Sequence, residues 1–304
     1  MLHRLWVYAV LVAIGCIGCA TSSSGVRPEP PGTLLEPGIY RVATGEPITE
    51  EVLLSELANV AVVYIGESHD VEAHHVVQAR VLVGLVERDP QGLALGMEMF
   101  QRPYQEALDR FVRSELDEAG MLVATEYAQR WGFDFAFYRP MMALMRDVQR
   151  PILALNAPAE LTRKVSRQGL EALSDVERAQ LPPTLSVDNP EHRAQFEAVM
   201  NSVHAGMDPA TMDRFYTAQA IWDATMAQTV VEGLKRSDVD QVVVLAGLFH
   251  VERGLGIPFH VQATQPDIRG AIIIPTQQTA AHPVVAEELF GSGVGDFVWV
   301  VSGS

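Results

Sequence analysis

Four apolar segments of this chain each carry a polar residue at or near their end, and this pattern constrains the fold more than any other feature. Residues 61–69, 93–100, 151–158 and 241–250 read AVVYIGESH, LALGMEMF, PILALNAP and QVVVLAGLFH. Short runs rich in Val, Ile and Leu are typical of buried strands of a parallel sheet. The ligand crevice of such a sheet lies outside the carboxyl ends of its strands. We therefore expect the following side chains to converge on one site: Glu67, His69, Glu98, Asn156 and His250.

Helical patterns separate these strands. Residues 70–89 have an amphipathic pattern with Asp70 as a plausible N-cap, and residues 103–147 are expected to be helical with interruptions. Apolar runs at 271–275 and 296–301 are expected to close the sheet. The alternation of strands and helices predicts an α/β fold with a mostly parallel central sheet flanked by helices.

The region from about 159 to 236 contains no strand pattern. Residues 159–181 read as two short helices joined at Gly169, and helices are also predicted over 192–206 and 209–236. Because roughly 75 residues are too many for one crossover connection, we expect a helical subdomain beside the sheet.

The charge balance excludes some classes of function. The chain has 304 residues and a formal net charge of −16, from 38 acidic and 22 basic residues. Such a charge repels phosphate backbones, so nucleic acid is not expected as a partner. No stretch after the N-terminus has the roughly 18 apolar residues that a membrane span needs, so we expect membrane contact through the N-terminus alone.

The N-terminus has the pattern of an export signal. Residues 1–19 have a basic start and then an apolar run that ends in two Gly-Cys pairs, similar to a bacterial lipobox. We expect acylation of Cys19, which precedes a polar stretch, with Cys16 and ordinary signal cleavage as alternatives. Residues 20–39 read as a flexible tether and residues 40–304 as the folded domain. The predicted location is therefore the cell envelope, with the outer membrane as the default because no Asp follows the favoured cysteine.

The strand-end residues allow two kinds of chemistry. Carboxylate and imidazole two residues apart, as in Glu67 and His69, serve as metal ligands or as a base and its orienting partner, and they also serve as polar caps of a helix. Glu98 lies among apolar residues and needs a metal, an Arg or a His as partner if it is buried. His250 follows a Gly in the same way, although a lone His in an apolar segment is also common as a satisfied core residue. These four residues are our candidate catalytic set and the candidate ligands of a divalent metal.

Other residues are weaker candidates. Asn156 either donates its amide to an oxyanion or forms an Asx turn before Pro158. His74 and His75 on the first helix either support the crevice residues from behind, reach the crevice themselves, or lie on a solvated face. Tyr138 and Tyr216 have polar tips inside apolar stretches that suit either core packing or a pocket for a flat ligand.

Several motifs together resemble the ChaN family of haem-binding lipoproteins. They are GESHDVEAHHVVQ, LGMEMFQRPYQEALDRF, the Tyr138-Arg139-Pro140 segment, ILALNAP and LAGLFHVERGLGIP, which cover about residues 60–258. The resemblance implies an exported iron-uptake protein that dimerises around haem, with a tyrosine as the iron ligand. Tyr216 and Tyr138 are the candidate ligands, and His74 and Asn156 are further candidate haem contacts.

The same pattern is similar to a wider superfamily that contains the Tiki metalloproteases and the erythromycin esterases. This resemblance implies hydrolysis, in which His69 or a metal-bound water is activated, Glu98 orients or accepts the proton, and His250 assists. Two hypotheses follow: a lipid-anchored, dimeric haem carrier, and a hydrolase that uses the strand-end cluster, with or without a metal.

Overall fold

The computed structural model describes residues 32–204 and 206–303. In this part of the chain, eight strands form one sheet in the order β2-β1-β8-β7-β3-β6-β4-β5. The strands from β8 to β5 are parallel to one another, and β1 runs antiparallel to β2 and β8. The fold is therefore α/β with a mostly parallel sheet, as the sequence predicted. The export signal and the two cysteines lie outside the described residues.

The elements have the following bounds. The strands are β1 (Gly38–Arg41), β2 (Glu46–Ile48), β3 (Val62–Glu67), β4 (Leu93–Gln101), β5 (Ile152–Asn156), β6 (Gln241–Gly247), β7 (Gly270–Gln278) and β8 (Phe297–Ser302). The α-helices are α2 (Glu50–Leu57), α3 (Glu72–Arg88), α4 (Gln105–Val112), α5 (Glu118–Ala124), α6 (Tyr127–Arg130), α7 (Arg139–Asp147), α8 (Ala159–Gln168), α9 (Asp175–Arg178), α10 (Pro190–Val203), α11 (Pro209–Leu234), α12 (Leu248–Val251), α13 (Ile257–Thr264) and α14 (Ala286–Ser292). Short 3₁₀ helices are η1 (Arg102–Tyr104), η2 (Phe135–Phe137), η3 (Leu170–Ala172) and η4 (Glu252–Gly254).

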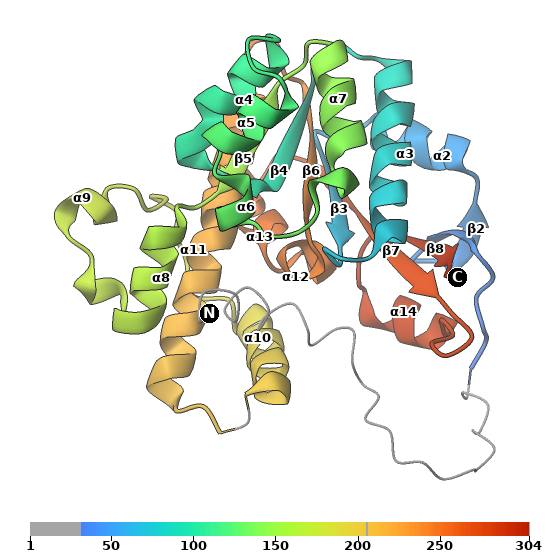
Figure 1. Cartoon of the computed structure of the whole chain (residues 1–304). Helices are drawn as coiled ribbons and strands as arrows, with labels where there is room; N and C mark the ends of the chain where they lie inside the picture. Colours follow the sequence, from blue (N-terminus) through green and yellow to red (C-terminus); the bar gives the residue numbers. More distant parts are fainter. Residues whose placement is uncertain (1–31, 205, 304) are drawn as a thin grey trace.

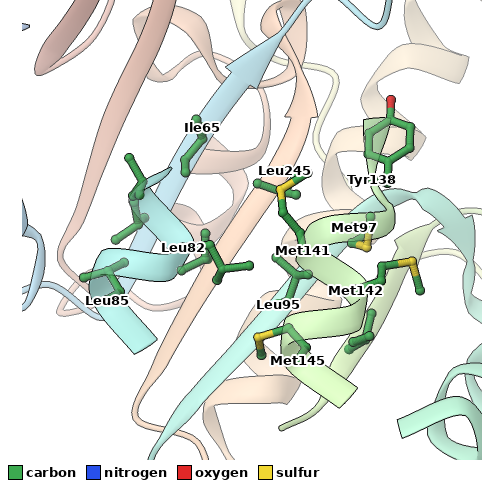
Figure 2. Packing of buried hydrophobic residues seen from close by; sticks show 14 of the residues in the cluster. Ile65, Leu82, Leu85, Leu95, Met97, Tyr138, Met141, Met142, Met145 and Leu245 are labelled. Atoms are coloured by element: carbon green, nitrogen blue, oxygen red, sulfur yellow. The ribbon is translucent and has the colours of Figure 1, made fainter. Parts of the chain in front are cut away.

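The sheet is buried between two helical layers. One layer contains α2, α3, α4, α5 and α7, and the other contains α11, α13 and α14 (Figure 1). Figure 2 shows how the first layer packs: side chains of α3 and α7 cover those of the strands. The labelled aliphatic and methionine residues are Leu82, Leu85, Met141, Met142 and Met145 on the helices, and Ile65, Leu95, Met97 and Leu245 on the strands. Both faces are covered, which explains why the central strands have continuous apolar runs rather than alternating ones.

Some predicted details differ from the structure. The expected cap of the first helix is wrong: the cap position of α3 is Val71, and its side chain makes no capping bond. The apolar segment that was predicted as a strand up to His250 changes to the one-turn helix α12 after Gly247. The strands β1 and β2 were not predicted, because both are short and β2 contains Pro47, which is typical of an edge strand.

The residues between β5 and β6 form helices in the described part of the chain. Helices α8 and α10 stand beside the long helix α11, which has 26 residues and lies against β5 (Figure 1). Asp208 caps α11 by accepting a hydrogen bond from the Thr211 amide, and Pro209 occupies its first turn. The structure shows no helix in the described residues with the length and apolar content of a membrane span.

The strand order determines where a ligand site is expected. β3 lies between β6 and β7, so the chain leaves β3 toward β4 on one side and later adds β7 on the other. Crevices of open α/β sheets form at such a switch point, outside the carboxyl ends of the strands. The carboxyl ends of β3, β4, β5 and β6 are therefore the place to look for a site.

Candidate functional site

Glu67 is the last residue of β3 and is the centre of a buried polar cluster. Its Oε1 accepts a hydrogen bond from the Tyr138 hydroxyl at 2.8 Å and lies 2.5 Å from His69 Nδ1. Its Oε2 lies 3.0 Å from His75 Nδ1. Burial alone would raise the pKa of Glu67, but the hydrogen bonds and charges of His69 and His75 hold that pKa below its usual range. Glu67 is therefore an ionised carboxylate that fixes two imidazole rings.

The ring of His69 is fixed in one orientation. The rings of Trp131 and Phe133 have their centroids 4.7 Å and 4.9 Å from that of His69, and Glu67 holds Nδ1. The other nitrogen, Nε2, faces the backbone of Gly247, where an added Cβ would lie 3.1 Å away. Because glycine occupies this position, no side chain of residue 247 crowds Nε2, and the ring lines the cavity.

A second cluster lies at the ends of β4 and β6. Glu98 Oε2 accepts a hydrogen bond from the Gly247 amide at 2.7 Å, and Glu98 Oε1 lies 3.3 Å from His250 Nε2. His250 Nδ1 lies 2.6 Å from Oδ1 of Asp223, whose other oxygen accepts from the Gln219 amide. Burial alone would lower the pKa of His250, but the two carboxylates raise it to about 10. His250 is therefore an imidazolium at neutral pH.

Burial also acts on the two carboxylates of this cluster. It would raise the pKa of Glu98 and of Asp223, but the charge of His250 and its hydrogen bonds lower both values below the usual range. The buried trio of Glu98, His250 and Asp223 consequently has two negative charges and one positive charge.

The position of His250 depends on a close approach at Gly256. A Cβ at this position would lie 2.4 Å from the His250 carbonyl oxygen and 3.0 Å from Asp223 Oδ1. We expect Gly256→Ala to lower the free energy of unfolding by roughly 2–3 kcal/mol, because the backbone of α12 must move. Urea unfolding measures this. The control is Gly291→Ala in α14, where nothing lies within 4 Å of the added Cβ; an equal loss at both positions would contradict the argument.

Both clusters open into one cavity of about 310 Å³. Its lining combines aromatic and apolar side chains with many polar ones, including charged residues from α6 and α8. The lining residues that the following argument uses are Glu67, His69, Glu98, Arg130, Trp131, Asn156, Arg163, Arg167, Trp222, Gly247, Phe249 and His250. A cavity of this size with convergent polar groups is typical of a small-molecule site.

The structure brings five of the predicted residues to the cavity and leaves His74 and the two tyrosines outside it. Glu67, His69, Glu98 and His250 line it, as does Asn156, whose amide donates to the Glu98 carbonyl at 3.0 Å. The Asn156 side chain also accepts from the Ala157 amide, so it holds the strand ends together. His74 is buried away from the cavity; its Nδ1 accepts from the Ser68 amide, and burial lowers its pKa to about 4.

The predicted divalent metal has no support in the structure. Among the described residues, no group of three or more His, Cys, Asp or Glu side chains is arranged to hold a metal ion. The carboxylates of both clusters instead accept hydrogen bonds from imidazole, hydroxyl or backbone groups.

The two candidate tyrosines do not line the cavity. Tyr138 is fully buried and donates to Glu67, and burial raises its pKa well above the usual value. In Figure 2 its hydroxyl points away from the methionines of α7. Tyr216 is buried on α11, donates to the Asn189 carbonyl at 3.1 Å, and has its pKa raised by burial to about 12. Each hydroxyl thus already has an acceptor.

Loss of the Tyr138 hydroxyl should be measurable. We expect Tyr138→Phe to lower the free energy of unfolding by about 1.5–3 kcal/mol, because the buried, ionised Glu67 loses one donor. Thermal or urea unfolding gives this value. Tyr40→Phe is the matched control, since its hydroxyl donates to the Glu36 carbonyl at the surface; a Tyr138 variant as stable as this control would show that Glu67 does not need the hydroxyl.

Two residues of the site were not predicted: Asp223 and Gln219, which are on α11 and hold His250. His75, the neighbour of His74 on the first helix, contacts Glu67 directly. Asp223 and Gln219 are four residues apart, so they share one helix face, and a buried acid inside an apolar helix was the signal that could have identified them.

The fold and this cavity define a class of α/β proteins whose ligand site lies at the carboxyl ends of an open sheet. A sequence profile of the haem-binding uptake family, Tiki superfamily, ChaN, matches residues 53–261. The chain belongs to this family.

Individual relatives are more distant. The chain is similar to the structure of ChaN of Campylobacter jejuni with cofacial haem binding, with a TM-score of 0.63, 18% identity, and coverage of 86% of this chain and 94% of that one. It is also similar to the chloroplastic protein RETICULATA-RELATED 5 of Arabidopsis thaliana, with 25% identity over 278 residues. The match covers 84% of this chain but only 36% of that relative's length. A structure of an erythromycin esterase has a TM-score of 0.47 and 12% identity, with coverage of 81% of this chain and 78% of that one.

Proposed function

We propose that this protein is a haem-binding lipoprotein of haem or iron uptake. Membership of the ChaN family over residues 53–261 is the observation that carries this proposal. The cavity supports it, because Trp131, Trp222 and Phe249 give it aromatic walls and arginines lie at its rim. A flat apolar macrocycle with carboxylate substituents has complementary chemistry.

The iron ligand that fits this cavity best is His69. Its Nδ1 is bound to Glu67, Nε2 faces Gly247, which has no side chain, and the residue lines the cavity. A carboxylate that orients a histidine through its other nitrogen is a common arrangement behind a metal-bound imidazole. A tyrosine ligand, which the family resemblance implies, requires Tyr138 or Tyr216 to leave its present acceptor.

A haem titration of the soluble domain tests both parts of this proposal. We expect a saturable Soret band, with dimer formation detected by sedimentation in the same samples. His69→Ala should weaken binding or change the spectrum, and Tyr138→Phe and Tyr216→Phe should leave the spectrum unchanged. Absence of binding in the wild type would overturn the proposed function, and a spectral change in either tyrosine variant would assign the iron to that tyrosine.

The lipid anchor is a separate part of the proposal. Cys19, or Cys16, would carry the lipid and hold the protein in the cell envelope, in the outer membrane by default. Cys19→Ser should move the full-length protein from the membrane fraction to the soluble fraction, with Cys16→Ser as the matched control. Retention of both variants in the membrane would contradict acylation at Cys19.

A second candidate function is hydrolysis, and the pairing of Glu67 with His69 favours it. A histidine whose Nδ1 is held by a buried carboxylate acts as a general base through Nε2. His69 would take a proton from water at the cavity floor, and the trio of Glu98, His250 and Asp223 would hold the strand ends that carry the site. A screen of esters and peptides with wild type, His69→Ala and His250→Gln tests this candidate; turnover that both variants retain would exclude the cluster.

A further inference from the structure

Two arginines at the cavity rim make no side-chain hydrogen bond and no close ion pair with the described residues. Arg163 and Arg167 are four residues apart on α8, so they lie on one face of the helix, and both line the cavity. Among the residues that the structure describes, they are the arginines whose guanidinium groups make neither a hydrogen bond nor an ion pair. The charge of Arg163 helps to lower the pKa of Glu160, but no carboxylate accepts a hydrogen bond from either guanidinium, which is unexpected in a chain with a net charge of −16.

The acidic groups on the same rim form ion pairs with another arginine. Arg130, which also lines the cavity, forms ion pairs with Glu126 at 2.8 Å and with Glu160 at 3.0 Å. Glu126 also accepts a hydrogen bond from the Tyr104 hydroxyl. Arg130 thus donates the guanidinium hydrogen bonds that these two carboxylates accept. The N–H donors of Arg163 and Arg167 remain available to a ligand in the cavity.

We propose that Arg163 and Arg167 form an oxyanion subsite at the mouth of the cavity, which binds a pair of carboxylates on an otherwise apolar ligand. Guanidinium groups are suited to this role because they form bidentate, charge-assisted bonds to planar oxyanions. The aromatic walls below the arginines, which include Trp131 and Trp222, contact the apolar body of the ligand. The identity of that ligand rests on the proposed function: in haem, the two propionates supply the paired carboxylates.

Porphyrin analogues separate this subsite from iron ligation. Protoporphyrin IX without iron keeps both carboxylates, and its dimethyl ester lacks them. We expect the wild type to bind protoporphyrin IX, and Arg163→Gln/Arg167→Gln to raise its Kd by at least ~10-fold, since each lost charge-assisted bond contributes to affinity. The ester should bind weakly and equally to both proteins. The matched control is Arg236→Gln, which removes one exposed positive charge at the far end of α11.

A probe without a macrocycle keeps the outcomes distinct. Inorganic pyrophosphate should raise the melting temperature of the wild type and leave that of the double variant unchanged. Haem binding with equal affinity in wild type and double variant would overturn the subsite and leave the proposed function standing. If the wild type binds neither haem nor protoporphyrin IX but is stabilised by pyrophosphate, haem is overturned as the ligand and the subsite is supported. No response to porphyrin or to pyrophosphate would overturn both.

Discussion

Asp223→Ala should lower the free energy of unfolding by about 3–5 kcal/mol, the usual cost of removing one partner of a buried ion pair. Asp223 is fully buried on α11, and its Oδ1 lies 2.6 Å from His250 Nδ1. Without it, the imidazolium of His250 keeps one carboxylate partner instead of two, and the Gln219 amide loses an acceptor. Urea unfolding at pH 7 gives the value.

The matched control is Asp213→Ala, on the same helix. Asp213 is 60% exposed and pairs with Arg193 at the surface, where ion pairs contribute about 0–1 kcal/mol. A loss at Asp223 no larger than at Asp213 would show that the buried pair does not contribute to stability. Asp223→Asn provides a second measurement: it keeps the shape and a hydrogen bond but removes the charge, so the pKa of His250, followed by NMR of the imidazole ring, should fall.

The residues at strand ends could be predicted from the sequence because the rule that predicts them is local. A run of apolar residues ends, and the polar residue at its end must lie at the edge of the sheet. Glu67 and His69 follow this rule, whereas Glu98 lies inside β4, three residues before its end. Their arrangement as hydrogen-bonded pairs does not follow from it, because the partners of Glu67 include His75 on α3 and Tyr138 in the turn before α7.

The helices between β5 and β6 explain most of what the sequence did not reveal. Asp223 contacts His250 across 27 positions of the sequence, and no periodicity marks an acid that is buried by a neighbouring element rather than by its own helix. The sequence also does not predict that two arginines of α8 make no side-chain hydrogen bond, because Arg163 and Arg167 have the pattern of ordinary exposed charges. Their significance depends on the carboxylates that Arg130 holds, which is a property of the assembled rim.

The two clusters have different roles in one cavity. Glu67 fixes His69 and leaves its Nε2 free, so this pair is suited to act on a ligand. In the second cluster both nitrogens of His250 contact carboxylates, so its charge is permanent near neutral pH. The second cluster is therefore structural: its imidazolium lies between two carboxylates and joins α11 to the strand ends.

Stability should consequently fall as the pH rises above neutrality. The pKa of His250 rises from 6.5 to about 10 on folding, so the native state binds one more proton than the unfolded chain between these values. The stabilisation is complete below pH 6.5 and is lost as the pH passes through about 10. We expect the free energy of unfolding to decrease by about 1.4 kcal/mol for each pH unit within this window, in addition to other titrating groups.

Urea unfolding at pH 6.5, 8 and 9.5 measures this slope, and His250→Gln separates it from other groups. The variant should be less stable than the wild type at pH 6.5, and the difference should shrink toward pH 9.5, because only the wild type loses a bound proton. His282→Gln, at an exposed position, should follow the wild type at every pH. A constant difference between His250→Gln and wild type across the window would mean that His250 does not retain its proton in the folded state, which would remove the basis for its fixed charge in the cavity.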